Sequence, residues 1–161
     1  MSMYLFVIIG LIAVFVFVEG AGMGFPAGWI TMIWDVPSLL MLAFITLPVL
    51  LASGLGKDFL NAFRLFFGKK EYSGLAERKK AIEALDVAIK SLRAGGIITV
   101  LLQFIGICNV LKEFDILKWQ ANMAVLLLPL VYAYMLNLLL LPIKSRLSKE
   151  VIDYMNDVEE I

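Results

Sequence analysis

The chain has 161 residues, of which 61% are hydrophobic and 17% are charged, and it carries 14 basic and 14 acidic residues. Soluble domains are closer to half apolar, and a chain of this length has too small an interior to bury the surplus, so an ordinary soluble domain is excluded. The balanced charge gives no indication of a nucleic-acid partner, the absence of His removes the commonest general base and metal ligand, and the single Cys108 excludes an internal disulfide and a cysteine-cluster metal site.

Four stretches without a charged residue predict four transmembrane helices, at 1–18, 36–56, 94–111 and 119–143. Crossing ~30 Å of hydrocarbon at about 1.5 Å per residue takes about 20 residues, which each stretch can reach, the third with help from its flanks. A signal peptide is the alternative for the first stretch, but no basic segment precedes it and no convincing cleavage site follows. We therefore predict an all-α membrane protein with four spans in one domain.

The second span opens with Asp35-Val36-Pro37-Ser38. Proline is tolerated in the first turn of a helix, and an acidic residue suits the positive end of the helix dipole. Taken alone, this tetrapeptide predicts a helix start rather than a binding site.

The distribution of basic residues predicts which side of the membrane each loop faces. Segment 57–93 holds nine Lys or Arg and the tail at 144–161 holds three, which leaves two of the 14 for the other loops. Cytoplasmic loops carry the excess of Lys and Arg. We therefore expect segment 57–93 and both chain ends to be cytoplasmic.

Both cytoplasmic segments have an apolar stripe at helical spacing. The stripes are Leu75, Ile82, Leu85, Ile89 and Leu92 in the loop, and Leu147, Val151, Tyr154, Met155 and Val158 in the tail. This spacing predicts two helices that pack against neighbouring helices. We expect the first helix to continue into the third span as one rod, and Pro142 to loosen the join between the fourth span and the tail.

The third span has a face of small and polar residues. Gly96, Thr99, Gln103 and Gly106 lie at positions i, i+3, i+7 and i+10, which is one side of a helix. Such a face lets another helix come close, and Gln103 needs a hydrogen-bond partner there. The face predicts either plain helix packing or a surface turned toward a pathway or a central partner helix.

The fourth span contains Pro129 and Asn137. Pro129 removes a backbone hydrogen bond, so we expect a kink there, and Asn137 should bond to a neighbouring helix rather than face lipid. No acidic or basic side chain lies deep in any span, although a proton or sodium path usually needs one.

Taken in order, three stretches resemble the MotA branch of the MotA/TolQ/ExbB family, the ring-forming subunits of ion-driven motors in bacterial inner membranes. Residues 35–40, with Asp35, Pro37 and Ser38, are similar to the start of the family's second span. Residues 57–63, with Lys57 and Asp58, look like the cytoplasmic exit from that span, and residues 137–143 resemble the end of the last span. The predicted topology, with four spans and both ends inside, agrees with the resemblance.

The resemblance implies a pentamer whose third and fourth spans line a central channel. A single-span partner of the MotB or ExbD type would sit in that channel and supply the membrane aspartate that carries a proton or sodium ion. The residues that would border the channel are Thr99, Gln103, Gly106, Pro129 and Asn137. Gly96 and Pro142 would be the flexing points, and the helix at 75–93 would transmit motion below the membrane.

Two departures from the family pattern lead to an alternative. The family's large cytoplasmic domain is reduced here to a short loop and one helix, and Pro129 stands where motor proteins usually hold a pathway threonine. The first hypothesis is a reduced motor ring subunit that couples ion flow to rotation or force, and the alternative is a non-conducting ring that acts as a scaffold or holds lipid. A small transporter would need an inverted repeat and a charged site, which the chain lacks. With no nucleophile–base pair in any span, we expect no enzyme activity, and we expect no cofactor, metal or nucleic-acid partner.

Overall fold

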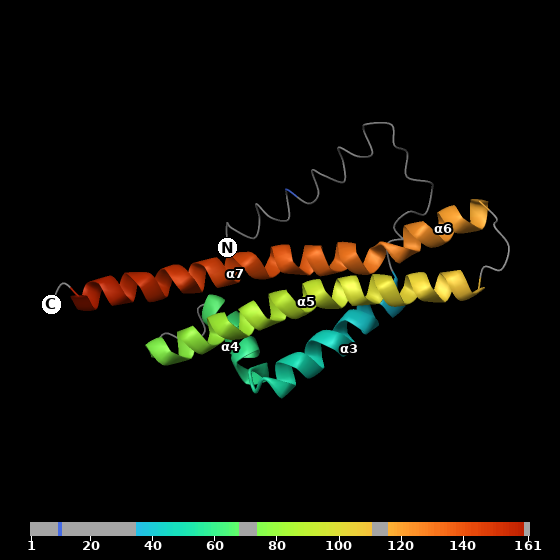
Figure 1. The fold of residues 1–161 in the computed structure, drawn as a ribbon. Helices are drawn as coiled ribbons and strands as arrows, with labels where there is room; N and C mark the ends of the chain where they lie inside the picture. Colours follow the sequence, from blue (N-terminus) through green and yellow to red (C-terminus); the bar gives the residue numbers. More distant parts are fainter. Residues whose placement is uncertain (1–9, 11–34, 68–73, 111–115, 160–161) are drawn as a thin grey trace.

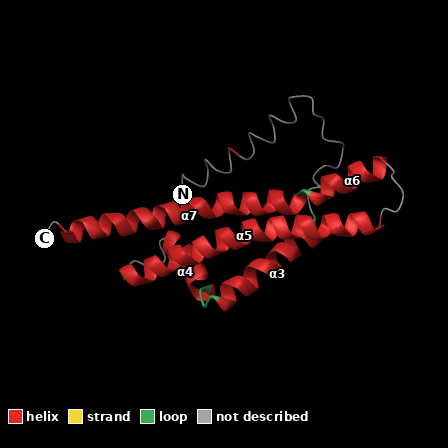
Figure 2. Cartoon of the chain, viewed as in Figure 1, coloured by secondary structure: helices red, strands yellow, loops and turns green. Residues whose placement is uncertain are grey.

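The computed structural model describes residue 10 and residues 35–67, 74–110 and 116–159, and these residues form helices and short turns without a strand (Figure 2). The helices with described bounds are α3 (Val36–Ala52), α4 (Gly56–Phe66), α5 (Leu75–Val110), α6 (Ile116–Leu126) and α7 (Leu128–Glu159). The first predicted span, 1–18, lies outside the described residues except for Gly10.

The two longest helices, α5 and α7, lie side by side and run antiparallel (Figure 1). Arg78 near the start of α5 pairs with Glu150 near the end of α7. At about 1.5 Å per residue, the 36 residues of α5 extend ~54 Å, well beyond ~30 Å of hydrocarbon. The helix predicted at 75–93 and the third predicted span therefore form one rod, as expected.

A row of small residues runs along α5 where it meets its neighbours. Ala81, Ala84, Ala88, Ser91 and Gly95 are all buried. They are spaced three or four residues apart and so share one side of the helix. Small side chains let helix backbones approach closely. α5 is accordingly the element against which α3, α4 and α7 all pack.

α3 ends at Ala52, four residues before the end of the span predicted at 36–56, and Gly54 follows shortly after it. Gly54 has a φ of +73°, a left-handed conformation that favours glycine. The Leu55 N–H donates to the Leu50 carbonyl at 3.1 Å and the Gly54 N–H donates to the Leu51 carbonyl at 3.0 Å. These two bonds form a Schellman motif, which closes a helix. The chain then turns through 101° into α4, so residues 53–55 form a bend and Gly56 already belongs to α4.

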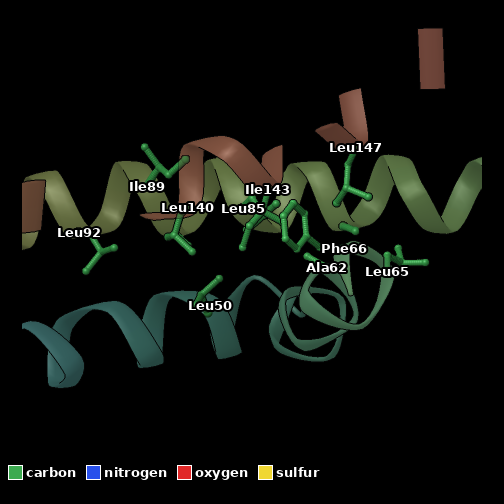
Figure 3. Close-up of a cluster of buried hydrophobic side chains, with 12 residues drawn as sticks. Leu50, Ala62, Leu65, Phe66, Leu85, Ile89, Leu92, Leu140, Ile143 and Leu147 are labelled. Carbon is green, nitrogen blue, oxygen red and sulfur yellow. The ribbon is translucent and has the colours of Figure 1, made fainter. Parts of the chain in front are cut away.

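Figure 3 shows the main cluster of buried apolar side chains, which joins α3, α4, α5 and α7. Its members are Leu50, Ala62, Leu65, Phe66, Ala81, Leu85, Ala88, Ile89, Leu92, Leu140, Ile143 and Leu147. Leu85, Ile89 and Leu92 come from the stripe predicted in the loop, which therefore packs against neighbouring helices. In the tail stripe, only Leu147 and Val151 are buried among the side chains that the structure describes. Farther along the tail, Tyr154 and Met155 are exposed.

The fourth predicted span, 119–143, is divided between α6 and α7. The helix breaks at Leu127, whose carbonyl accepts the N–H groups of Leu130 and Val131, each at 3.1 Å. Pro129 lacks the N–H that would bond one turn back, so the break falls where the kink was predicted. At Pro142 the helix is unbroken, and flexing there stays a prediction.

Among the described residues, two segments are long and apolar enough to cross a membrane, Leu75–Asn109 and Asn122–Asp157, and α3 with α4 makes a third if the bent pair is one span. The described part of the chain is thus all-helical and compatible with a membrane protein.

Candidate functional site

Polar groups from three helices meet at the start of α3. The Ser38 hydroxyl donates to the Asp35 carboxylate, and the side-chain amide of Gln103 on α5 donates to the Ser38 hydroxyl oxygen at 3.3 Å. The backbone N–H of Asp35 donates to the hydroxyl of Tyr132 on α7 at 2.9 Å. Asp35, Ser38, Gln103 and Tyr132 are called the polar cluster below. The cluster fixes the first turn of α3 to both long helices.

The polar cluster lies alongside the apolar part of α5 rather than beyond its end. Gln103 precedes Val110, the last residue of α5, by seven residues, or about 10 Å of helix. Ser38 is fully buried beside it, and Asp35 is half-buried. Asp35 therefore lies deeper along the bundle than its place at the start of a predicted span suggested.

Thr99 lies one turn from Gln103 and is 1% exposed. Its hydroxyl donates to the Gly95 carbonyl at 2.8 Å, within its own helix. This local bond satisfies the hydroxyl proton, so Thr99 contributes to packing without reaching another helix through its donor.

Two neighbouring glycines set how closely α5 is approached from two sides. A Cβ added to Gly96 would lie 2.9 Å from the Cβ of Ala133 on α7, a distance that real Cβ atoms essentially never show. A Cβ added to Gly95 would lie 3.2 Å from Cγ2 of Ile45 on α3. The close approach predicted for the Gly96 face is therefore present, and the approaching helix is α7 of the same chain.

Two buried polar side chains, on α3 and α7, have no hydrogen-bond partner in the described part of the chain. Asn137 on α7 is 2% exposed with both amide atoms unpaired, and Thr46 on α3 is 7% exposed with its hydroxyl unpaired. The side-chain oxygen of Gln103 is also buried and unpaired. Each such group costs about 1–3 kcal/mol, so each calls for an explanation such as a bound water or another chain.

The residues predicted to border a channel do not share one exposed face of the chain. Thr99, Pro129 and Asn137 are buried, Gln103 is half-buried, and Gly106 is exposed, with nothing within 4 Å of a Cβ added to it. The structure brings Gln103 together with Asp35 and Ser38, two of the residues that carry the family resemblance, while Pro37 occupies the first turn of α3. That these residues border a channel in an assembly stays a prediction.

Lys57 and Asp58 lie in the first turn of α4, at the opposite end of α3 from the polar cluster. Asp58 is half-buried, and its carboxylate suits the positive end of the α4 dipole. Lys57 is exposed. These two residues therefore open α4, directly after the bend that follows α3.

Ion pairs join the amino-terminal half of α5 to the carboxyl-terminal half of α7. Asp86 on α5 accepts hydrogen bonds from Lys144 on α7 and from Lys90 one turn along. These two bonds, that of Lys144 first, hold the pKa of the Asp86 carboxyl below its ordinary value, against a smaller opposing effect of burial. Arg78 and Glu150 pair at 3.0 Å farther out.

Sequence reasoning missed Tyr132, Thr46 and Gly95. Tyr132 stands in an apolar run and Thr46 in another, so neither is distinguished by its neighbours. Gly95 is adjacent to Gly96, and the pair could have indicated that two helices approach α5 from different sides.

The described residues include no group of three or more His, Cys, Asp or Glu placed to hold a metal ion. No protein-family model, curated protein or solved structure gives a significant match to the chain.

Proposed function

We propose that the chain is a reduced ring subunit of an ion-driven motor in a bacterial inner membrane, of the MotA/TolQ/ExbB kind. In this proposal five copies surround a single-span partner and couple proton or sodium flow to rotation or force. The observation that carries the proposal is the bonding of Asp35 and Ser38 to Gln103 and Tyr132 of the two long helices. Two residues that carry the family resemblance are thus joined by hydrogen bonds to a residue predicted to border the channel.

The outer surface of α5 and α7 supports assembly within a membrane. Its exposed apolar residues include Ile97, Ile98, Leu101, Leu102, Phe104, Ile105, Val131, Leu136, Leu138 and Leu141. Side chains of this kind suit lipid, a neighbouring subunit or a partner helix. Residues 94–110 and 128–143 contain no acidic or basic residue, so these two stretches supply no ionisable group for an ion path, and the proposal assigns that group to the partner.

The second candidate is a non-conducting ring that acts as a scaffold or holds lipid. The burial of Thr99, Pro129 and Asn137 inside the protomer favours it, because these residues then offer no polar groups to a central channel. Such a ring without a partner helix would have an apolar centre that lipid tails could fill.

The mass and symmetry of the purified complex test both candidates. Native mass spectrometry and two-dimensional classes from electron microscopy should give a five-fold ring with density on its axis for the motor. A five-fold ring with a lipid-filled centre would favour the scaffold, and a monomer or dimer would contradict both. For a ring with axial density, an ion-flux assay in proteoliposomes containing the partner then decides whether the ring conducts.

A further inference from the structure

One side of α4 carries two cations and two exposed apolar side chains. Lys57, Leu60, Arg64 and Phe67 recur at intervals of three or four residues and so share one side of the helix. All four are exposed, Leu60 at 61% and Phe67 at 65%. The single acid of the helix, Asp58, lies about a quarter of a turn farther round from Lys57 and is half-buried. These four residues are called the outward face of α4.

The opposite side of α4 is fixed to the bundle. Ala62, Leu65 and Phe66 belong to the main buried cluster (Figure 3). Arg146 of α7 donates to the Phe66 carbonyl at 3.3 Å, and its guanidinium carbon lies 5.2 Å from the centre of the Phe66 ring. This arrangement closes the carboxyl end of α4 with a cation and holds the outward face away from the bundle.

The length of α3 and the bend after it suit a position of α4 at a membrane surface. The 17 residues of α3 extend ~25 Å, close to the hydrocarbon thickness, and the 101° bend turns α4 nearly perpendicular to α3. If α3 crosses the bilayer, α4 lies in the plane of the surface. The neighbouring helices become charged near α4, with Asp86 and Lys90 on α5 and Lys144 on α7.

We propose that the outward face of α4 binds the headgroups of anionic phospholipids. Leu60 and Phe67 would enter the boundary between headgroups and acyl chains, where an apolar side chain leaves water, and Lys57 and Arg64 would contact the lipid phosphates. The charge is complementary, because the face has two cations and no acid, and the leaflet facing a basic loop is the anionic one. This inference goes beyond the proposed function and applies equally to a motor and to a scaffold.

Lipid titrations of the full-length chain, followed by native mass spectrometry, test the proposal. The probes are phosphatidylglycerol and phosphatidylcholine, and the quantity measured is the ratio of their affinities. In the double variant Lys57→Gln, Arg64→Gln, the preference for phosphatidylglycerol should fall about fivefold for each cation removed. The matched control, Lys79→Gln with Lys80→Gln, removes two exposed cations from α5 and should leave the preference unchanged. An unchanged preference in the α4 variant, or an equal loss in the control, would overturn the proposal.

A depth measurement in liposomes containing phosphatidylglycerol gives a second test. Cys108 is the only cysteine, so Cys108→Ala allows a fluorophore to be attached through Leu60→Cys or, as a control, through Tyr154→Cys in the exposed tail. Lipids brominated near the headgroups should quench the label at 60 but not at 154. Absence of quenching at 60, or a change of oligomer size with unchanged lipid preference in the α4 variant, would assign the face to another contact. Both readouts remain valid for a monomer, so their failure is distinguishable from failure of the proposed function.

Discussion

The hydroxyl of Tyr132 accepts the backbone N–H of Asp35 at 2.9 Å, which links residues 97 positions apart in the sequence. This N–H belongs to the residue just before α3, so no bond within the helix can satisfy it. Tyr132 is 8% exposed, and an unpaired N–H in such surroundings would be costly. The start of α3 therefore depends on a side chain from α7.

Replacing Tyr132 with Phe should destabilise the start of α3. The ring is kept but the acceptor is lost, and leaving the Asp35 N–H unpaired should lower the free energy of unfolding by about 1–3 kcal/mol. Hydrogen exchange should accelerate at residues 35–39 and much less in the middle of α5. Tyr134→Phe is the control, because Tyr134 is 51% exposed. Equal effects of the two variants would argue against the bond.

Gly96→Ala should separate α5 from α7. Its Cβ would lie 2.9 Å from that of Ala133, so the helices must shift, and we expect a loss of about 1–3 kcal/mol in unfolding experiments in detergent. Gly106→Ala is the matched control, since nothing lies within 4 Å of its added Cβ. The control should be neutral or gain up to about 1 kcal/mol from the helix propensity of Ala. Similar losses for both variants would contradict this account of the packing.

Asn137→Leu distinguishes packing from a polar role. Both amide atoms of Asn137 are unpaired within the described residues, so an apolar side chain of similar size should raise the unfolding free energy by about 1–3 kcal/mol. The comparison is made by thermal unfolding of the purified chain, with Leu138→Ile at an exposed neighbouring position as the control. A destabilised variant would instead show that Asn137 is bonded, through water or another chain, in the folded protein.

The ion pair of Asp86 predicts a loss of stability in acid. Since Lys144 and Lys90 hold the folded-state pKa below the ordinary value of 3.8, the contribution is complete above about pH 4 and is lost as the pH falls through the folded pKa. In Asp86→Asn, thermal stability should change less between pH 5 and pH 3 than in the native chain. Asp153→Asn, at an exposed position, should retain the native pH dependence. If Asp86→Asn kept the native dependence of thermal stability on pH, the loss of stability in acid could not come from the Asp86 ion pair.

The rod of α5 was predictable because its two halves follow one another directly, although Gly95-Gly96 at the join is a pair that weakens a helix. A heptad stripe at 75–92 meets an uncharged stretch at 94, and Arg93 interrupts neither. The end of α3 was not predicted. Gly54 is a common residue just after a helix, but the apolar residues on both sides of it favoured a longer span.

The polar cluster could not be predicted in the same way. Tyr132 has no polar neighbour in sequence to mark it, and its partner is a backbone group that every residue possesses. The face of Gly96, Thr99 and Gln103 followed from helical spacing, but spacing does not say which helix covers a face. Here α7 covers Gly96 and α3 approaches Gln103.

Because α5 is one unbroken helix, a small tilt at one point along it would move its far end by a larger distance. From Gly96, where α7 is in closest contact, to Leu75 is 21 residues, or ~31 Å of helix. A tilt of about 10° pivoting at Gly96 would therefore carry Leu75 through ~5 Å, about the rise of one helical turn. Because Asp86 is paired with Lys144 and Arg78 with Glu150, the arm of α7 would swing with that of α5. Such a change of angle at Gly96 would thus become a displacement of about one helical turn at the far end of both helices.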